Sequence, residues 1–146
     1  MSLRALIPFI VFSIIASTGS LAKKRETIAG PVFAKVLNVY DGDTIEVLAK
    51  VWPGHQINVR VRIRDIDAPE MRSKCSGERF AALNARDRLR KFIAGQPVLL
   101  TNIKGGKYFG RVLANVKTHA GHNVKSVLLA SGLVRPYRGK RRAGWC

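Results

Sequence analysis

A strictly alternating segment is the strongest constraint on how this chain folds. Between residues 57 and 64, polar residues alternate with the apolar residues Ile57, Val59, Val61 and Ile63. The polar positions are Asn58, Arg60, Arg62 and Arg64. A period of two residues places the two kinds of side chain on opposite faces of a β-strand. The segment therefore predicts a strand with one face in a hydrophobic core and one cationic face outside it.

Four further segments favour strands because β-branched residues recur in them. They cover residues 32–39, 44–51, 97–103 and 110–117. The pair Asp41-Gly42 separates the first two segments, and Asp-Gly is a frequent turn in β-hairpins. We therefore expect the first two strands to form a hairpin.

Two segments carry helix signals. Residues 76–93 combine apolar residues with good helix formers, with Ser76 as the expected N-cap and Gly95 beyond the end. Asn123 is expected to cap a second helix that ends near Ala130. Three strands, a helix, two strands and a helix fit one mainly β (α+β) domain. We expect a five-stranded Greek-key barrel of the OB-fold type with two or three α-helices.

The first 22 residues have the composition of a secretory signal. Arg4 precedes an apolar stretch from Leu6 to Ala16, and small residues follow at Ser20-Leu21-Ala22. The stretch falls short of the roughly 20 residues that span a bilayer, which argues against the alternative of an uncleaved anchor. We expect cleavage after Ala22, a periplasmic or secreted protein without stable membrane association, and one monomeric domain over residues 23–146.

Two cysteines, Cys75 and Cys146, are present. In an exported protein an even cysteine count predicts a disulfide, which would hold the end of the chain down. Two free thiols are the alternative, because Cys146 is the last residue and chain ends are often mobile.

Charge narrows the class of partner. The chain has 26 lysines and arginines against nine acidic residues, a formal net charge of +17. Such an excess attracts nucleic acid, anionic glycan or membrane headgroups, and charge alone does not choose among them.

Six of the nine acidic residues nevertheless lie between Asp41 and Glu70. An acidic cluster in so basic a chain suggests a hard metal ion acting on a polyanion.

The candidate metal ligands lie at the ends of neighbouring predicted strands. Asp43 and Asp67 could converge there, Asp41 could support them from outside, and Pro69 could hold the Ala68 carbonyl outward as a further ligand. Oxygen ligands of this kind suit Ca²⁺, and also Mg²⁺ and Mn²⁺. The histidines are expected at the surface without a metal role; they are His55, His119 and His122.

Hydrolysis of a phosphodiester needs an activated water and donors that hold the phosphate in line for attack. Glu70 is the expected base for the water. Arg62 and Arg111 are the expected clamps on the phosphate, because a planar guanidinium binds phosphate oxygens in bidentate fashion.

Four motifs in order resemble the thermonucleases, the staphylococcal nuclease family of Ca²⁺-dependent secreted nucleases. They are residues 41–44, 61–70, 107–111 and 123–133. The resemblance implies an OB barrel, one Ca²⁺ ion, and endonucleolytic cleavage of DNA and RNA with little sequence preference and 3′-phosphate products. It also implies site roles for the residues named above: Asp43, Asp67 and the Ala68 carbonyl on the metal, Glu70 as base, and Arg62 and Arg111 on the phosphate.

One departure concerns the substrate side of the site. Phe109 stands where the best-known family member has a tyrosine, so Tyr108 or Tyr137 is expected to contact the nucleotide instead.

Two alternative functions remain beside that of a nuclease. One is a nucleic-acid-binding OB module without catalysis, and the other is a secreted cationic protein that binds anionic glycan.

Overall fold

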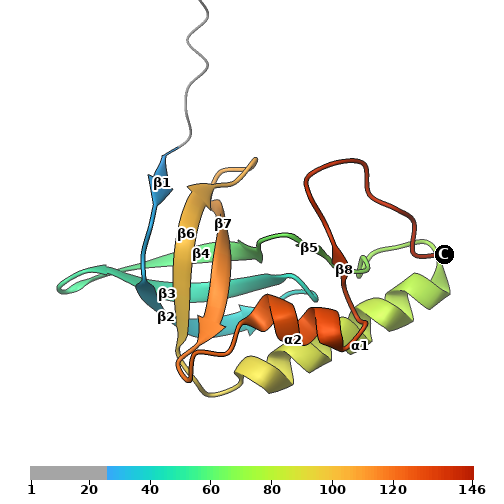
Figure 1. Ribbon diagram of the computed structural model, residues 1–146, viewed down its shortest axis with the longest axis horizontal. Helices are drawn as coiled ribbons and strands as arrows, with labels where there is room; N and C mark the ends of the chain where they lie inside the picture. The colour runs from blue at the N-terminus through green and yellow to red at the C-terminus, as the bar shows by residue number, and fades with distance from the viewer. Residues whose placement is uncertain (1–25) are drawn as a thin grey trace, which may run out of the picture.

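Five strands close into a barrel, as the element order predicted. The computed structural model describes residues 26–146, so the expected signal at residues 1–22 lies outside the described residues. Neighbouring strands follow the order β6-β2-β3-β4-β7, and β7 pairs back with β6 to close the ring (Figure 1). All of these pairs are antiparallel except β4 with β7, which is parallel. The strands are β2 (Val32–Val39), β3 (Thr44–Trp52), β4 (His55–Ile63), β6 (Val98–Gly105) and β7 (Arg111–Thr118).

Three short strands and two helices complete the described part of the chain. A first strand, β1 (Thr27–Ile28), pairs with β6, and β5 (Ile66–Asp67) pairs with β8 (Arg135–Pro136). The helices α1 (Ser76–Ile93) and α2 (Val124–Ala130) lie side by side at one end of the barrel (Figure 1). Neither of these helices is long and apolar enough to cross a membrane.

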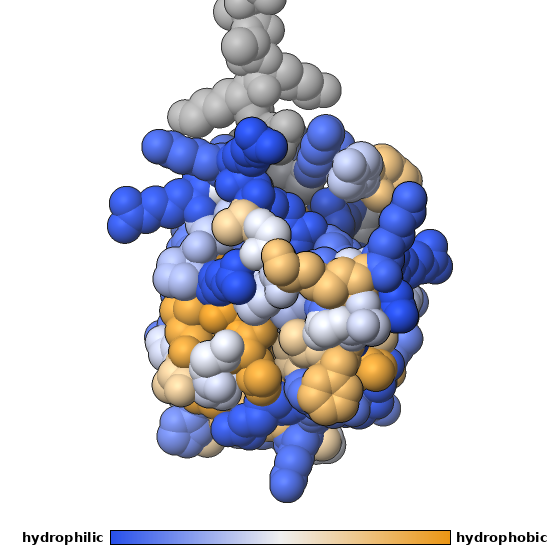
Figure 2. Space-filling model, turned by 90° about the vertical axis from the view of Figure 1, so that its right-hand side faces the viewer, coloured by the Kyte–Doolittle hydropathy of each residue, from blue (hydrophilic) through white to orange (hydrophobic). Residues whose placement is uncertain are grey.

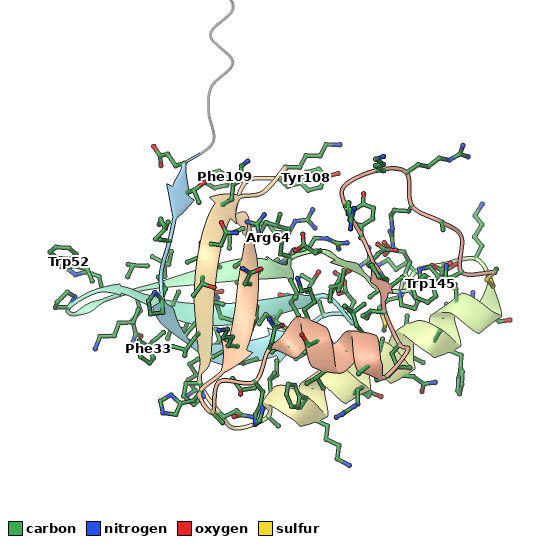
Figure 3. All side chains as sticks on the ribbon, viewed as in Figure 1. Phe33, Trp52, Arg64, Tyr108, Phe109 and Trp145 are labelled. Carbon is green, nitrogen blue, oxygen red and sulfur yellow. A yellow bond between two sulfur atoms is a disulfide. The ribbon has the colours of Figure 1, made fainter. Side chains whose placement is uncertain are left out.

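The alternating segment forms β4, but only half of its apolar face reaches the core. Val61 and Ile63 are fully buried, whereas Ile57 is 48% exposed. The β3–β4 hairpin extends beyond the barrel, with Trp52 at its tip (Figure 3), so the start of β4 has no core to face. The pattern thus predicted the strand correctly and the burial of Ile57 wrongly.

Small residues bring α1 close to the barrel. Its buried face consists of Ala82, Ala85, Leu89 and Ile93, while Phe80 is 68% exposed. The expected N-cap was one residue late, because Cys75 has the extended backbone of a cap and its sulfur accepts from the Glu78 N–H. At the second helix, Asn123 caps as expected by accepting from the Ser126 N–H.

The end of the chain lies beside the start of α1, where a disulfide joins Cys146 to Cys75 (Figure 1). Residues 137–146 contain no helix or strand. Seen from the side on which the C-terminus lies, hydrophilic side chains cover the upper part of the molecule and apolar ones gather in the lower half (Figure 2).

Candidate active site

The turn between β2 and β3 positions the first candidate ligand. A Cβ atom on Gly42 would lie 2.6 Å from Cβ of Ala85 and 2.9 Å from Cβ of Ala68, so only glycine fits between α1 and the strand end. Asp41 accepts a hydrogen bond from the Asp43 N–H at 2.9 Å. The pair Asp41-Gly42 therefore serves packing and positioning as well as the turn.

Asp43 is 2% exposed, and both of its carboxylate oxygens accept hydrogen bonds. One of its oxygens accepts from the Arg62 guanidinium at 2.6 Å and from the Thr44 hydroxyl at 2.8 Å. The other accepts from the Ala68 N–H at 3.0 Å. Burial, and after it the negative charge of Asp41, raises the pKa of Asp43 to about 7, although Arg62 opposes the shift. A buried carboxylate of this kind favours any further positive charge that can reach it.

Asp67 lies on β5 and is 4% exposed. Its Oδ1 faces two guanidinium groups: Nη2 of Arg62 at 3.4 Å and Nε of Arg142 at 2.7 Å. Its Oδ2 accepts from the indole N–H of Trp145 at 3.4 Å. Arg62 thus bridges both aspartates, and the predicted convergence of Asp43 and Asp67 is present.

Glu70 follows in a loop held by the first turn of α1. The Glu78 carboxylate accepts from the Glu70 N–H at 3.0 Å and from the Ser73 hydroxyl at 2.6 Å. The hydrogen bond from Ser73, followed by the one from the Glu70 backbone, lowers the pKa of Glu78. The Glu70 side chain stays 55% exposed, and its carboxylate pairs with Arg142.

Arg142 is the residue that the sequence did not single out. Its guanidinium contacts the Asp67 carboxylate, the Ala68 carbonyl at 2.8 Å and the Glu70 carboxylate. Burial opposes its charge, but the bonds to Glu70 and Asp67 outweigh burial and raise the pKa of Arg142.

In the sequence Arg142 resembles its neighbour Arg141, and only the pairing of Cys146 with Cys75 would have placed it at the site. We call Asp43, Arg62, Asp67, Glu70 and Arg142 the closed centre.

The closed centre has the donor chemistry of a site for a hard cation. Within residues 26–146, no three histidine, cysteine or acidic side chains converge as a metal cluster. The expected set, however, is two aspartates plus the Ala68 carbonyl, and a main-chain oxygen is a normal Ca²⁺ ligand. Asp67, Ala68 and Glu70 all direct oxygens at one positive group, the Arg142 guanidinium. Asp67 and the Ala68 carbonyl therefore offer oxygens that suit a divalent ion at the position of the Arg142 guanidinium, whereas both Asp43 oxygens accept hydrogen bonds from Arg62, Thr44 and the Ala68 N–H.

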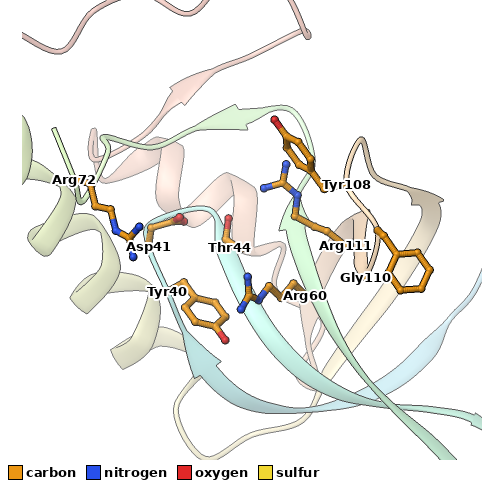
Figure 4. A pocket seen from close by; sticks show the side chains of 9 residues that line it. Tyr40, Asp41, Thr44, Arg60, Arg72, Tyr108, Gly110 and Arg111 are labelled. Atoms are coloured by element: carbon orange, nitrogen blue, oxygen red, sulfur yellow. The ribbon is translucent and has the colours of Figure 1, made fainter.

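Arg111 lies apart from the closed centre, in an open cavity of about 610 Å³ that we call the aromatic cleft (Figure 4). Two arginines stack on tyrosines there: Arg60 over Tyr40 at 4.7 Å and Arg111 over Tyr108 at 4.9 Å from the ring centres. Asp41 and Thr44 also line the cleft, so it opens beside Asp43. The cleft is lined by Tyr40, Asp41, Thr44, Arg60, Arg72, Tyr108, Phe109, Gly110 and Arg111.

A second cavity, of about 340 Å³, is lined by Arg62 and Arg111 together with Tyr137. The two expected phosphate clamps therefore face one space, although the Arg62 nitrogens bind Asp43 and Asp67. Tyr137 donates its hydroxyl to the Lys140 carbonyl at 2.7 Å, and Tyr108 is 59% exposed beside Phe109 on the β6–β7 loop (Figure 3).

The remaining predicted surface residues behave in two ways. The histidines are exposed as expected. Arg64, expected on the cationic face outside the core, donates to the carbonyls of Asn102 at 2.7 Å and Leu113 at 3.3 Å. Arg64 therefore ties β4 to β6 and β7.

Comparison with known proteins identifies the family. Residues 60–144, more than half of the chain, match the model of the family described as Staphylococcal nuclease homologue. The chain belongs to this family. The match begins at Arg60 and so includes Arg62, Asp67, Glu70 and Arg111 but not Asp43. Asp43 joins them through the pairing of β3 with β4, in which its neighbour Thr44 lies opposite Arg62.

Three relatives share about a third of their aligned residues with this member of the family. An uncharacterized endonuclease of Escherichia coli is 30% identical over 110 residues, which cover 75% of this chain and 64% of the relative. Micrococcal nuclease of Shigella flexneri is 32% identical over 111 residues, 71% of this chain and 58% of the relative. Protein ParB of Escherichia coli is 34% identical over 128 residues, which cover 80% of this chain and 66% of the relative. The chain thus spans less than two thirds of the length of each.

Proposed function

We propose that this protein is an exported, divalent-metal-dependent endonuclease that hydrolyses phosphodiester bonds of DNA and RNA with little sequence preference. The observation that carries the proposal is that Asp43 and Asp67 converge on Arg62, while Asp67, the Ala68 carbonyl and Glu70 converge on Arg142, in a family of nuclease homologues. The relatives named as endonuclease and micrococcal nuclease support this activity.

Each residue has a distinct task in the proposed reaction. Glu70, exposed at the rim, takes the proton from the attacking water. Arg62 and Arg111 face the same cavity and grip the phosphate oxygens that gain charge in the transition state. Asp43, Asp67 and the Ala68 carbonyl would hold a divalent ion, for which we propose Ca²⁺, and the bound ion would act as a Lewis acid on that phosphate. Attack opposite the 5′ oxygen breaks the P–O5′ bond and leaves a 3′-phosphate on one product, while the leaving 5′ oxygen takes a proton from water and becomes a hydroxyl on the other.

The aromatic cleft gives the flanking strand a place to bind. Arg60 and Arg111 offer charge to phosphates, while Tyr40 and Tyr108 offer rings on which bases of any sequence stack. Stacking of this kind tolerates every base, which suits cleavage with little sequence preference. The net charge of +17 attracts any nucleic acid to the surface.

The protein is proposed to act as a monomer in the periplasm or outside the cell, after removal of residues 1–22. The disulfide between Cys75 and Cys146 supports an oxidising compartment. Sequencing the N-terminus of protein recovered from cells tests this, since the proposal requires a start at Lys23.

The test of the activity is cleavage of single-stranded DNA, duplex DNA and RNA with Ca²⁺, with Mg²⁺ and with chelator. Glu70→Gln and Arg111→Ala are compared with wild type. We expect cleavage that needs the ion and collapses in both variants, with 3′-phosphate termini on the products. Salt-sensitive binding of all three polymers without cleavage under any ion would instead establish the non-catalytic binding module.

A further inference from the structure

The last ten residues form a strap across the closed centre. At one end, β8 pairs with β5 and sets Arg135 opposite Asp67. At the other, Cys146 is bonded to Cys75, five positions after Glu70 (Figure 3). Both ends of the strap are therefore fixed on either side of the proposed metal ligands.

The middle of the strap inserts one guanidinium into the site. Nε of Arg142 contacts Asp67 at 2.7 Å, Nη2 donates to the Ala68 carbonyl at 2.8 Å, and Nη1 pairs with Glu70. All three nitrogens of one side chain thus bind the oxygens assigned to the metal and to the base. These bonds are charge-assisted and place a full positive charge where the ion is expected.

A second contact steadies the strap. The Arg135 guanidinium stacks on the Trp145 ring at 3.8 Å and donates to the Gly144 carbonyl at 2.8 Å. The Trp145 indole N–H reaches Asp67 at 3.4 Å. Arg142 itself remains 36% exposed on a segment without regular structure, so its side chain can leave without unfolding the barrel.

We propose that Arg142 is a tethered internal cation that closes the site and exchanges with the divalent ion. The proposal rests on the proposed function, because it assumes that the ion binds to Asp67 and the Ala68 carbonyl. The ion would need the Asp67 oxygen and the Ala68 carbonyl at bonding distance, and these are the atoms that the Arg142 guanidinium contacts at 2.7 and 2.8 Å, whereas Arg62 stays 3.4 Å from Asp67. Binding of the ion must therefore displace Arg142, and the strap lowers the apparent affinity for the ion.

The matched pair Arg142→Gln and Arg141→Gln tests this exchange. Both variants remove one positive charge from the strap, but only the first removes a group from the site. Calorimetric titration with Ca²⁺ should show about tenfold tighter binding to Arg142→Gln than to Arg141→Gln, the factor expected if the strap is closed in about nine-tenths of molecules. The double variant Cys75→Ser/Cys146→Ser, which frees the strap, should lie between wild type and Arg142→Gln.

Trp145 reports the movement directly. In a Trp52→Phe background, Trp145 is the only tryptophan, and Trp52 lies at the far tip of the β3–β4 hairpin (Figure 3). Titration with Ca²⁺ should change the emission of Trp145 in the wild-type strap, with a midpoint that moves to lower Ca²⁺ concentration in Arg142→Gln. This readout needs no substrate and no cleavage.

The outcomes separate the strap from the nuclease. Equal Ca²⁺ affinity in Arg142→Gln and Arg141→Gln, or weaker binding to Arg142→Gln, would overturn the internal cation and leave the proposed function standing. The absence of any heat with wild type and all variants would overturn both the exchange and the metal dependence. Tighter binding to Arg142→Gln without cleavage of any nucleic acid would support the exchange and refute the nuclease.

Discussion

The closed centre and the aromatic cleft differ in the surroundings of their charged side chains. In the closed centre, Asp43 and Asp67 are buried and every carboxylate is paired with an arginine. In the cleft, Arg60 and Arg111 rest on tyrosine rings and face an open cavity. The first arrangement holds atoms in fixed positions, and the second presents charge and flat rings to a long ligand. The difference predicts that, in the proposed nuclease, Glu70 serves cleavage without strand binding, whereas Arg111, which faces both cavities, serves both.

Glu70→Gln tests whether cleavage can be lost without loss of strand binding, and it has the largest expected effect. Loss of the base should lower the rate of DNA cleavage by about 10²- to 10⁴-fold, the usual range for general base catalysis. DNA affinity, measured by fluorescence anisotropy in chelator, should stay within about twofold because Glu70 does not line the cleft. Glu26→Gln, which changes an exposed carboxylate on another part of the surface, is the control. Equal loss of cleavage and binding would contradict this prediction.

A second prediction concerns the packing that supports the closed centre. Gly42→Ala forces a methyl group against Ala85 and Ala68. It should lower the free energy of unfolding by about 1–3 kcal/mol, as overpacking generally does. Thermal unfolding followed by circular dichroism measures this. Gly105→Ala, where an added Cβ meets nothing within 4 Å, should be close to neutral. An unchanged Tm for Gly42→Ala would show that the turn and α1 are not tightly joined.

The cleft is tested by removing one of its rings. Tyr108→Ala should weaken binding of single-stranded DNA by about 1 kcal/mol, the lower end for base stacking, because Tyr108 is 59% exposed. The rate of cleavage at saturating DNA should stay near that of wild type. Trp52→Ala is the matched exposed aromatic, at the hairpin tip away from the cleft. Similar losses of affinity in both variants would argue against a defined path for the strand.

The last prediction is a pH dependence of stability in chelator. The pKa of Asp43 rises from 3.8 to about 7 on folding, chiefly through burial, so the folded state favours its protonated form. Its contribution to stability is present below about pH 4 and is lost as the pH rises through about 7. The Tm of wild type minus that of Asp43→Asn should therefore fall across this window. A difference that stays constant with pH would mean that Asp43 is charged throughout.

The elements themselves followed from short-range patterns. Alternation predicted β4, and turn and cap residues such as Gly42 and Asn123 marked element ends to within a residue or two. The errors arose where burial depends on distant partners. Ile57 alternates like Val61 but lies on the part of the hairpin that extends beyond the barrel.

For the candidate site, strand ends and residue types were enough to bring Asp43 and Asp67 together, because register in a β-ladder fixes which residues meet. The same patterns did not predict the hydrogen bond from the Glu70 N–H to the Glu78 carboxylate or the stacking of Arg60 on Tyr40. Those contacts join residues whose spacing follows no period.

By itself, the sequence determined the barrel, its family and the set of oxygen donors, because these depend on periodicity, turn chemistry and motifs within short segments. Only the tertiary structure decided which cation those oxygens hold. Arg142 and Arg141 are chemically identical neighbours, and the one that reaches Asp67 is selected by the β5–β8 pairing and by the bond from Cys146 to Cys75. That selection depends on where both ends of a ten-residue strap are fixed in space, which no local pattern encodes.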